Sequence, residues 1–476
     1  MVRRVHARRI AYVKLLFILA QTSYIRHFES VVLALADRGH ELRLAVSREG
    51  HTSLAPALAA HPRISQTICP SGRNDKWREP VETLRSLADY VHYLEPAFLP
   101  AEKLRTRAFR NLAKSLTGHE KTHIKLRCPY CKERIADDEA GKLLMSLGDQ
   151  GLQGLRRLLQ AMEASVRPDS AHEQWLRAER ADAVLVTPLV NHGSGQSEWV
   201  KAARVLKIPV GFPVFSWDNL TTKGLIHEQP DRLFVWNEIQ RKEAADYHGI
   251  PREHVVVTGA PRFDDFFSMA PSTGRAPFCR GLGLDSARTI ITYLCSSEFV
   301  SGREVEFVRQ WIDEVRQDPM LRTTNILIRP HPRSLEQWDQ FMPARGSGIA
   351  VAASGVMNAD QLLYDSLYHS AAIVGLNTSA QLEAGILGKP VYTMLAPGFE
   401  RGQQGALHFQ YLLAQHGGFV EVADSFDSHR SQLAQGVAGR VDRTRVDRFI
   451  ESFIRPSGLH LPATPILADA IEALAS

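Results

Sequence analysis

Four polar residues stand at and just inside the start of one predicted helix, in the stretch "NTSAQLEAGILGKPV": Asn377, Thr378, Ser379 and Glu383. Backbone N–H groups and hydroxyls at a helix start can hold phosphate oxygens, helped by the helix dipole. Glu383 follows Ser379 by four positions, so both lie on one face, one turn apart. A carboxylate there can accept hydrogen bonds from the two hydroxyls of a ribose. The alternative is an N-cap hydroxyl followed by an ordinary first-turn acid.

A second polar loop, "ILIRPHPRS", follows an apolar run of strand length and carries Arg329, His331 and Arg333. Its two prolines fix φ and remove backbone donors, so they stiffen the loop that presents these side chains. Two cations and an imidazole suit a phosphate-bearing ligand. A solvated turn with surface charges is the alternative.

Two residues in the first half are candidate general bases. Asp218, in "FPVFSWDNLTTKG", follows a predicted strand and can take the proton of an attacking hydroxyl if it lies within hydrogen-bond reach. An Asx-type turn beside a packed tryptophan is the alternative reading. His27 lies just beyond the first predicted strand, near a helix start. It is the rival base, or else a structural histidine on a helix face.

The compact stretch "GHEKTHIKLRCPYCKER" offers four zinc ligands: His119, His123, Cys128 and Cys131. Cys-x-x-Cys is half of many structural zinc sites, but the usual spacer between ligand pairs is missing. A redox dithiol and plain reduced cysteines are the alternatives. The chain has five cysteines, and an odd, scattered count suits a reducing cytoplasm better than a disulfide framework.

These residues need elements to position them, and the sequence alternates strands with helices. Apolar runs at 13–20, 40–47, 181–190, 209–215, 231–237 and 254–259 predict the strands of a first domain, and runs at 288–297, 323–332, 348–354, 371–379 and 389–396 those of a second. This alternation predicts parallel α/β sheets. We expect an N-terminal domain over 1–268 with a helical insertion at about 75–180, a linker at 269–285, a second domain over 286–441 and a helical tail over 442–476. Ligands of such sheets bind beyond the carboxyl ends of the strands.

The charge balance limits the classes of partner that the chain can bind. A formal charge of +5 over 476 residues, with no recognisable nucleic-acid-binding motif, argues against nucleic acid. Residues 101–136 hold ten Lys or Arg against three acids, which is a solvated helical face or a contact with an anionic membrane. The basic, apolar start lacks a cleavage site and is interrupted by Lys14, so we interpret it as a basic tail and a first strand. No apolar run approaches the roughly 18 residues of a membrane span.

The ordered combination of "RPHP" and "NTSAQLEAGILGKPV" resembles the nucleotide-binding half of GT-B glycosyltransferases and their relatives, which include polyol-phosphate transferases, capsule-polysaccharide enzymes and UDP-sugar 2-epimerases. The resemblance implies two Rossmann-like domains facing a cleft. It also implies that the hydroxyl-rich turn meets the donor diphosphate and that Glu383 meets the ribose.

Two further stretches support this resemblance. The segment 235–267 is similar to the one that closes the N-terminal domain in these enzymes, where Gly259 would permit close backbone approach and Arg262 would contact phosphate. In "YLCSSEF", Ser296 and Ser297 end the first strand of the second domain and would face the same ligand. GT-B transfer generally needs no catalytic metal, and "RFDDFF" is not a D-x-D metal site.

The sequence therefore predicts a glycosyltransferase with a nucleotide-sugar as co-substrate, no catalytic cofactor, and a surface-glycan or lipid-linked acceptor. It would be cytoplasmic, with peripheral contact at the inner face of the plasma membrane. The alternatives are a CDP-glycerol-type polyol-phosphate transferase, a UDP-sugar 2-epimerase, and a non-catalytic membrane-surface binding module.

Overall fold

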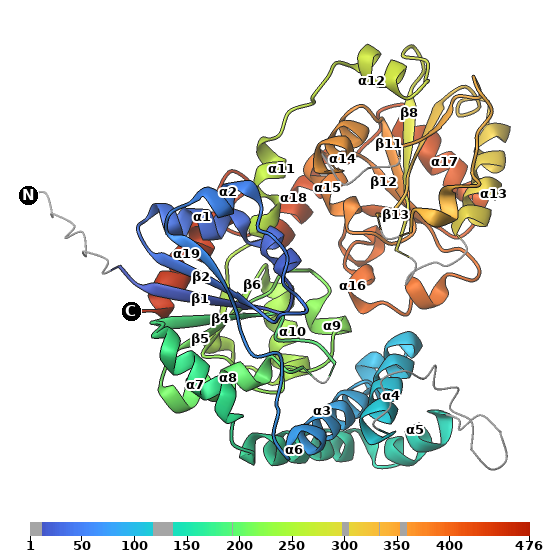
Figure 1. Ribbon diagram of the computed structural model, residues 1–476. Coiled ribbons are helices and arrows are strands. Elements are labelled where there is room, and N and C mark those ends of the chain that lie inside the picture. The colour runs from blue at the N-terminus through green and yellow to red at the C-terminus, as the bar shows by residue number, and fades with distance from the viewer. Residues whose placement is uncertain (1–11, 118–136, 193, 298–303, 333, 353–358) are drawn as a thin grey trace, which may run out of the picture. The chain divides into compact units, whose positions relative to one another are not determined.

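The computed structural model of the chain describes residues 12–117, 137–192, 194–297, 304–332, 334–352 and 359–476. The chain divides into two compact units. Unit 1 consists of Met1–Pro96, Arg105–Arg262 and Leu461–Ser476, and unit 2 of Ala97–Leu104 and Phe263–His460. Each unit contains one parallel sheet with helices packed on it (Figure 1).

The sheet of unit 1 has, among the described residues, seven strands in the order β3-β2-β1-β4-β5-β6-β7, all of them parallel. The strands are β1 (Lys14–Leu19), β2 (Glu41–Val46), β3 (Ile64–Ile68), β4 (Ala183–Thr187), β5 (Val210–Pro213), β6 (Arg232–Val235) and β7 (Val255–Val257). Both faces of a parallel sheet are covered by helices, which explains why β1 and β4 are almost continuously apolar. β3 was not predicted, because "ISQTI" has polar residues at its three central positions.

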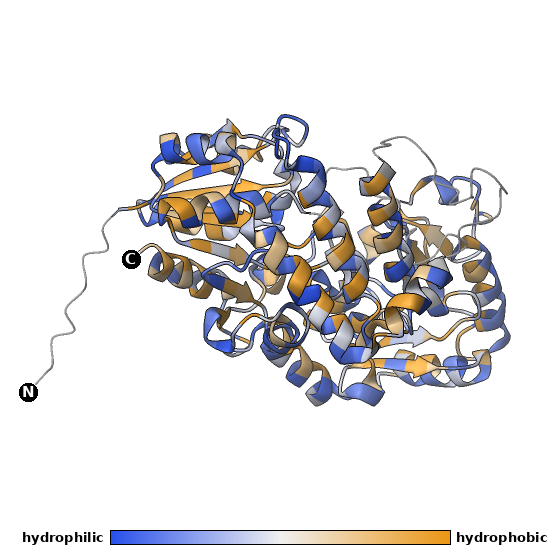
Figure 2. Ribbon diagram, turned by 90° about the horizontal axis from the view of Figure 1, so that it is seen from below, coloured by the Kyte–Doolittle hydropathy of each residue, from blue (hydrophilic) through white to orange (hydrophobic). Residues whose placement is uncertain are grey.

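The helices of unit 1 include the predicted helical insertion, which is confirmed between β3 and β4. The α-helices are α1 (Glu29–Asp37), α2 (Pro56–Ala60), α3 (Arg78–His92), α4 (Glu102–Thr117, whose first turn falls in unit 2), α5 (Asp137–Met145), α6 (Gly148–Ser165), α7 (Ser170–Glu179), α8 (Ser197–Leu206), α9 (Asn219–Thr222), α10 (Glu238–His248) and α19 (Ala463–Leu474). Figure 2 shows the helices with alternating orange and blue residues, whereas the strands are mainly orange.

A buried ion network fastens the insertion to the rest of unit 1. Arg85 of α3 contacts Glu163 of α6 at 2.5 Å and Glu198 of α8 at 2.6 Å. Lys201 of α8 contacts Glu163 at 2.7 Å. These side chains are nearly inaccessible, so losing one partner would leave a buried charge uncompensated. The network therefore fixes how α3 and α6 sit on α8.

The sheet of unit 2 has, within the described ranges, six parallel strands in the order β10-β9-β8-β11-β12-β13. The strands are β8 (Ile290–Leu294), β9 (Asn325–Arg329), β10 (Ile349–Val351), β11 (Ala372–Gly375), β12 (Val391–Met394) and β13 (Val420–Ala423). The helices are α11 (Asp264–Ser268), α12 (Arg275–Gly281), α13 (Glu304–Gln317), α14 (Ala359–Tyr368), α15 (Ala380–Ile386), α16 (Leu407–Gln410), α17 (Phe426–Val437) and α18 (Arg443–Ile454). The two parallel α/β sheets confirm the predicted fold class.

The segment 269–285, expected to be a linker, is attached to unit 2. Asp365 of α14 accepts hydrogen bonds from the backbone N–H of Ser272 at 2.9 Å and from its hydroxyl at 2.5 Å. The hydroxyl of Tyr364 donates to the carbonyl of Met269 at 2.7 Å. The segment also contains α12. The glycines and prolines of this segment interrupt any periodic pattern, so its structure could not be predicted from the sequence. Side chains of α14, which is distant in the chain, hold the segment in place.

The helical tail ends on the opposite unit from the one in which it begins. α18 packs against α15 in unit 2, whereas α19 packs against α1 in unit 1, beside the first strands (Figure 1). Leu467 and Ile471 of α19 join the apolar core under β1 and β2. Arg38 at the end of α1 pairs with Asp469 at 2.7 Å. The end of the chain is thus part of the N-terminal α/β unit.

Candidate functional site

The strand order of unit 2 reverses between β8 and β11, and the residues that follow these two strands come together. Gly375, the last residue of β11, is in register with Leu294, the last residue of β8. Beyond them, the backbone N–H of Asn377 donates to the Ser296 hydroxyl at 3.3 Å. Ligands of open α/β sheets bind at this kind of reversal, at the carboxyl ends of the strands. The predicted residues therefore stand where the topology favours a ligand.

The turn between β11 and α15 is held by amide side chains. Asn377 is buried, and its Nδ2 donates to the carbonyl of Gly402 at 2.7 Å. Gln381 accepts from the N–H of Thr378 at 3.3 Å and donates to the carbonyl of Gly375 at 3.1 Å. Thr378 and Ser379 are half-buried, and Ser379 precedes α15 without making a side-chain N-cap hydrogen bond. Capping therefore does not account for this hydroxyl.

Glu383 lies in the first turn of α15, one turn beyond Ser379, and only 5% of its surface is exposed. Its carboxylate is largely covered by protein, so its charge needs partners within the fold. Gln381, Leu382 and Ala384 of the same helix are buried as well. The whole start of α15 is thus packed, which makes the turn before it a rigid feature.

Arg329 and His331 follow on the neighbouring strand. Arg329 ends β9 in register with Leu294, and its backbone carbonyl accepts from the N–H of Cys295 at 2.9 Å. Burial lowers the pKa of the Arg329 guanidinium to about 10, so it stays charged at neutral pH. His331 is half-buried directly after Pro330. A buried cation at this edge is suited to an anionic ligand.

Glu304, the first residue of α13, supports the loop that carries Ser296 and was not identified from the sequence. It accepts hydrogen bonds from the Ser296 N–H at 2.8 Å and from the Tyr293 hydroxyl at 3.1 Å. Desolvation raises the pKa of the buried Glu304 carboxyl to about 7. Ser297, the next predicted residue, is half-buried.

In unit 1 the strand order reverses between β1 and β4, and His27 follows β1 at the end of a 3-10 turn, Thr22–His27. Its ring lies 5.1 Å from that of Phe215. Burial, together with the charges of Arg262 and Arg26, holds the pKa of His27 well below its usual value, while Asp218 acts in the opposite direction. The imidazole is therefore neutral at neutral pH, the form that can accept a proton.

Asp218 is held by its own short turn. Its carboxylate accepts from the Ser216 hydroxyl at 2.6 Å and from the Thr222 hydroxyl at 2.9 Å, and Lys223 lies at 3.4 Å. The Asx-type turn considered for this stretch is not what holds it: the side chain of Asn219 accepts from the N–H groups of Phe215 and Ser216, which precede it, whereas in an Asx turn the side chain accepts from the N–H two residues later. His27 packs on Phe215, three residues before Asp218, so the two candidate bases lie on neighbouring segments of unit 1.

Gly259 and Arg262 lie just after β7. Gly259 has φ of 82°, a left-handed conformation that other residues adopt at a cost, and its N–H donates to the carbonyl of Trp236 at 3.1 Å. Arg262 was expected to contact phosphate, and its charge also acts on His27. The sequence did not indicate that the charge of Arg262 acts on His27, because the two residues are far apart in the chain.

The described residues can be compared with what a metal site and a membrane-spanning helix require. Among them, no cluster of three or more His, Cys, Asp or Glu side chains is arranged to hold a metal ion. The four zinc candidates, His119, His123, Cys128 and Cys131, lie outside the described residues. Cys69, Cys279 and Cys295 are buried free thiols. Every helix within the described ranges is too short or too polar to pass through a bilayer.

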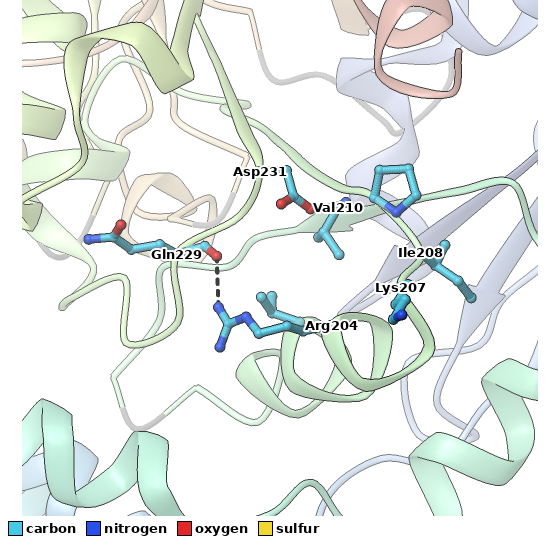
Figure 3. A pocket seen from close by; sticks show the side chains of 8 residues that line it. Arg204, Lys207, Ile208, Val210, Gln229 and Asp231 are labelled. Atoms are coloured by element: carbon cyan, nitrogen blue, oxygen red, sulfur yellow. Dashed lines mark hydrogen bonds between the residues drawn. The ribbon is translucent and has the colours of Figure 1, made fainter.

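A pocket at the other edge of the unit 1 sheet is separate from these residues. Figure 3 shows this cavity of about 270 Å³, where Arg204 donates to the carbonyl of Gln229 at 3.2 Å. Val210, the first residue of β5, lines it, so it opens at the amino end of that strand. His27 and Asp218 follow the carboxyl ends of β1 and β5, and the pocket is therefore not part of their site.

No protein-family model matches the chain, and no curated protein does. Solved structures match it over almost its whole length. A putative UDP-N-acetylglucosamine 2-epimerase from Listeria monocytogenes is 13% identical, with a TM-score of 0.53 and coverage of 97% of this chain and 96% of that chain. A glycosyltransferase from Rickettsia africae is 10% identical, with a TM-score of 0.51 and coverage of 97% and 98%. MnaA from S. aureus, solved with UDP, is 13% identical, with a TM-score of 0.50 and coverage of 97% and 96%. The expected GT-B fold is confirmed.

Proposed function

We propose that this chain is a glycosyltransferase that moves a sugar from a nucleotide-sugar donor to a surface-glycan or glycolipid acceptor. The observation that carries the proposal is the buried polar turn after β11, which is joined to Ser296 at the strand-order reversal of unit 2. The similar MnaA structure was solved with UDP, which favours a uridine nucleotide as the first ligand to test.

Unit 2 would bind the donor. In this proposal the N–H groups and hydroxyls at the start of α15 hold the diphosphate, and Glu383 accepts from the ribose hydroxyls. Arg329 and His331 lie on the neighbouring strand end and would stabilise the negative charge that develops on the leaving diphosphate. The remaining donor contacts of unit 2 are assigned to Ser296, Ser297, Asn377, Thr378 and Ser379. Gly259 and Arg262, which the resemblance implies as further donor contacts, belong to unit 1.

Unit 1 would supply the base. The acceptor oxygen forms a bond to the anomeric carbon, and the bond from that carbon to the diphosphate oxygen breaks, its electron pair leaving with the nucleoside diphosphate. The hydroxyl proton passes to the base. His27 is a candidate for this role because its imidazole is neutral, with Arg26 Nε donating to its Nε2 at 3.4 Å, and two hydroxyls and Lys223 engage Asp218. Asp218 then orients the acceptor or serves as the rival base.

A thermal-shift panel of UDP, GDP, CDP, CMP and TDP tests the donor site. Ligand binding to the native state raises its stability by mass action, by about 2.7 kcal/mol at a hundredfold excess over Kd. We expect one nucleotide to raise Tm and Glu383→Gln to weaken its binding by about tenfold or more, because the ribose hydrogen bonds to a carboxylate are lost.

Glu336→Gln is the matched control, because Glu336 is an exposed acid of the same unit. It should leave the nucleotide shift unchanged. If no nucleotide shifts the native protein, the proposal fails and a non-catalytic binding module is favoured. If Glu383→Gln binds as tightly as the native protein, the ribose role of Glu383 is wrong.

A UDP-sugar 2-epimerase is the second candidate, favoured by the similar Listeria structure, whose name includes that activity. Incubation with UDP-GlcNAc alone separates the two, because an epimerase converts it without an acceptor. A polyol-phosphate transferase would instead consume CDP-glycerol, which the same assay can include.

We also propose that the helical insertion contacts an anionic membrane. Leu147, Leu158 and Met162 are about half exposed, and their spacing places them on one face of α6. The neighbouring α5 exposes Leu143. α4 carries five cations against one acid. Apolar side chains beside basic ones suit the surface of an anionic bilayer.

A further inference from the structure

Glu304 is a buried acid that connects the two loops of the proposed donor site. It is the first residue of α13, and its side chain is fully buried. Its carboxylate accepts from the N–H of Ser296 at 2.8 Å, and the hydroxyl of Ser296 accepts from the N–H of Asn377 at 3.3 Å. Ser296 thus joins the loop after β8 to the turn after β11, and Glu304 holds Ser296 in place.

This joint sets where the groups assigned to the diphosphate lie. Thr378 and Ser379 follow Asn377 directly in the chain. Ser296 holds the backbone of Asn377, and the carbonyl of Gly402 holds its side chain at 2.7 Å. Binding groups must be fixed in this way for a ligand to be held in one geometry. Glu304 would therefore act on a ligand through other residues and not by touching it.

The charge of the Glu304 carboxyl matters at this position. Two hydrogen bonds, through Ser296, separate it from the backbone of Asn377, where the phosphate-binding turn begins. A carboxylate there repels a diphosphate, and burial leaves little water or salt to screen the repulsion. Burial also raises the pKa of Glu304 to about 7, so the neutral and the charged carboxyl are both present near neutral pH.

The titratable groups packed around Glu304 keep their charge in this pH range. Burial and the charge of Glu304 raise the pKa of Tyr293 and of Cys295 well above their usual values, so both stay neutral. The helix α17, which packs on α13, carries His429, whose pKa burial lowers to about 4. Arg329 acts on Cys295 and stays charged. Of these groups, Glu304 is the one that changes charge between pH 6 and 8.

We propose that Glu304 is a positioning residue of the donor site and that the protein binds its nucleotide when this carboxyl is uncharged. This inference rests on the proposed function and adds the regulation of its donor site by pH. The neutral carboxyl still accepts from the Ser296 N–H through its carbonyl oxygen, and it places no negative charge beside the diphosphate. Nucleotide binding then favours the protonated form, so the protein takes up protons as it binds.

Calorimetric titration at pH 6, 7 and 8 tests the inference. The probes are UDP, GDP, CDP, CMP and TDP, and the tightest of them is compared between the native protein and Glu304→Gln. The amide stays uncharged and still accepts from the Ser296 N–H. With a pKa of about 7, the neutral fraction of Glu304 falls about tenfold between pH 6 and 8, so the Kd of the native protein should rise about tenfold more than that of the variant.

Two further variants separate this role from support of the fold alone. Tyr293→Phe removes a hydroxyl that donates to Glu304 at 3.1 Å and lowers its pKa, so the midpoint of the pH dependence should move to higher pH. Glu336→Gln, which changes an exposed acid of the same unit, should keep the native pH dependence. Titration of His331 and of the nucleotide's own phosphates occurs with every protein compared, so it cancels. Urea unfolding at pH 6 and 8 checks that each variant is folded.

The same pH dependence in the native protein and in Glu304→Gln overturns the inference, and so does a midpoint that Tyr293→Phe leaves in place. A folded Glu304→Gln that binds no nucleotide at pH 6 also overturns it, because the amide and the protonated acid are both uncharged. In each of these cases the native protein still binds a nucleotide and the proposed function stands. A native protein that binds no nucleotide at any pH loses both.

Discussion

Glu304 shows how one buried carboxyl makes stability depend on pH. Its pKa is about 7 in the folded protein, against an ordinary value of 4.5, because burial disfavours the charged form. The folded state therefore holds this proton more tightly than the unfolded chain does. The stabilising contribution of Glu304 to the free energy of unfolding is fully present below pH 4.5, and it is lost as pH rises through 7. The shift corresponds to about 3 kcal/mol.

Glu304→Gln should remove this dependence, because the amide cannot ionise and can still accept from the Ser296 N–H. We expect the variant to gain stability relative to the native protein as pH rises from 5 to 8, measured by urea unfolding at several pH values. If the difference in unfolding free energy between the two proteins stays constant with pH, the raised pKa assigned to Glu304 is wrong. Desolvation lowers the pKa of the buried His429 to about 4, so this group reduces the stability of the protein as pH falls below 6.5. The effect is the same in both proteins and cancels in the comparison.

At this scale the sequence identified residues by type and spacing but not their environments. Asn377, Ser379 and Glu383 stand out because hydroxyls, an amide and an acid follow an apolar run. The pKa of Glu304 depends on burial, which no local pattern reports.

Among the elements, α19 was predicted as a helix, but its partner was not. Its apolar face carries Leu467, Ala468 and Ile471. This pattern predicts that another part of the protein covers these side chains, but it does not identify which part. The structure supplies α1 of unit 1 as that surface. Strands such as β1 were predictable because they are apolar throughout, whereas the polar β3 and the glycine-rich segment around α12 were not.

Leu467→Ala should destabilise unit 1 by about 2–5 kcal/mol, because a fully packed leucine leaves a cavity when truncated. Hydrogen exchange should then accelerate in α1 and β2 more than in unit 2. Leu461→Ala is the control, because Leu461 is about half exposed and its truncation should cost little. Equal acceleration in both units would show that α19 does not stabilise unit 1 in particular.

Considered as a whole molecule, the chain has a small net charge that is unevenly spread, since α4 alone carries five cations and one acid. If the insertion contacts a bilayer, binding to anionic vesicles should weaken as salt rises, because screening removes the electrostatic part. Leu158→Glu combined with Met162→Glu should reduce co-sedimentation severalfold by removing the apolar part.

Leu461→Glu is the matched control for that experiment, since it adds an acid at an equally exposed leucine outside the insertion. It should leave co-sedimentation unchanged. Vesicle binding that depends on neither salt nor the paired substitutions would contradict the membrane proposal.

The division of the chain into two α/β halves was predictable from its alternation of strands and helices. The attachment of the segment 269–285 to unit 2 was not predictable, because it depends on Asp365 and Tyr364 of a distant helix.

The return of the last helix to unit 1 has a consequence for biosynthesis. Unit 2 ends at His460, so its residues have all left the ribosome before the final helix emerges. Until then α1 lacks the leucine and isoleucine that complete its apolar covering. Chains generally fold domain by domain from the N-terminus during translation. Unit 1, whose synthesis starts first, can therefore be completed only after unit 2 has been synthesised, and a nascent chain that stalls before α19 emerges would expose the apolar face of α1.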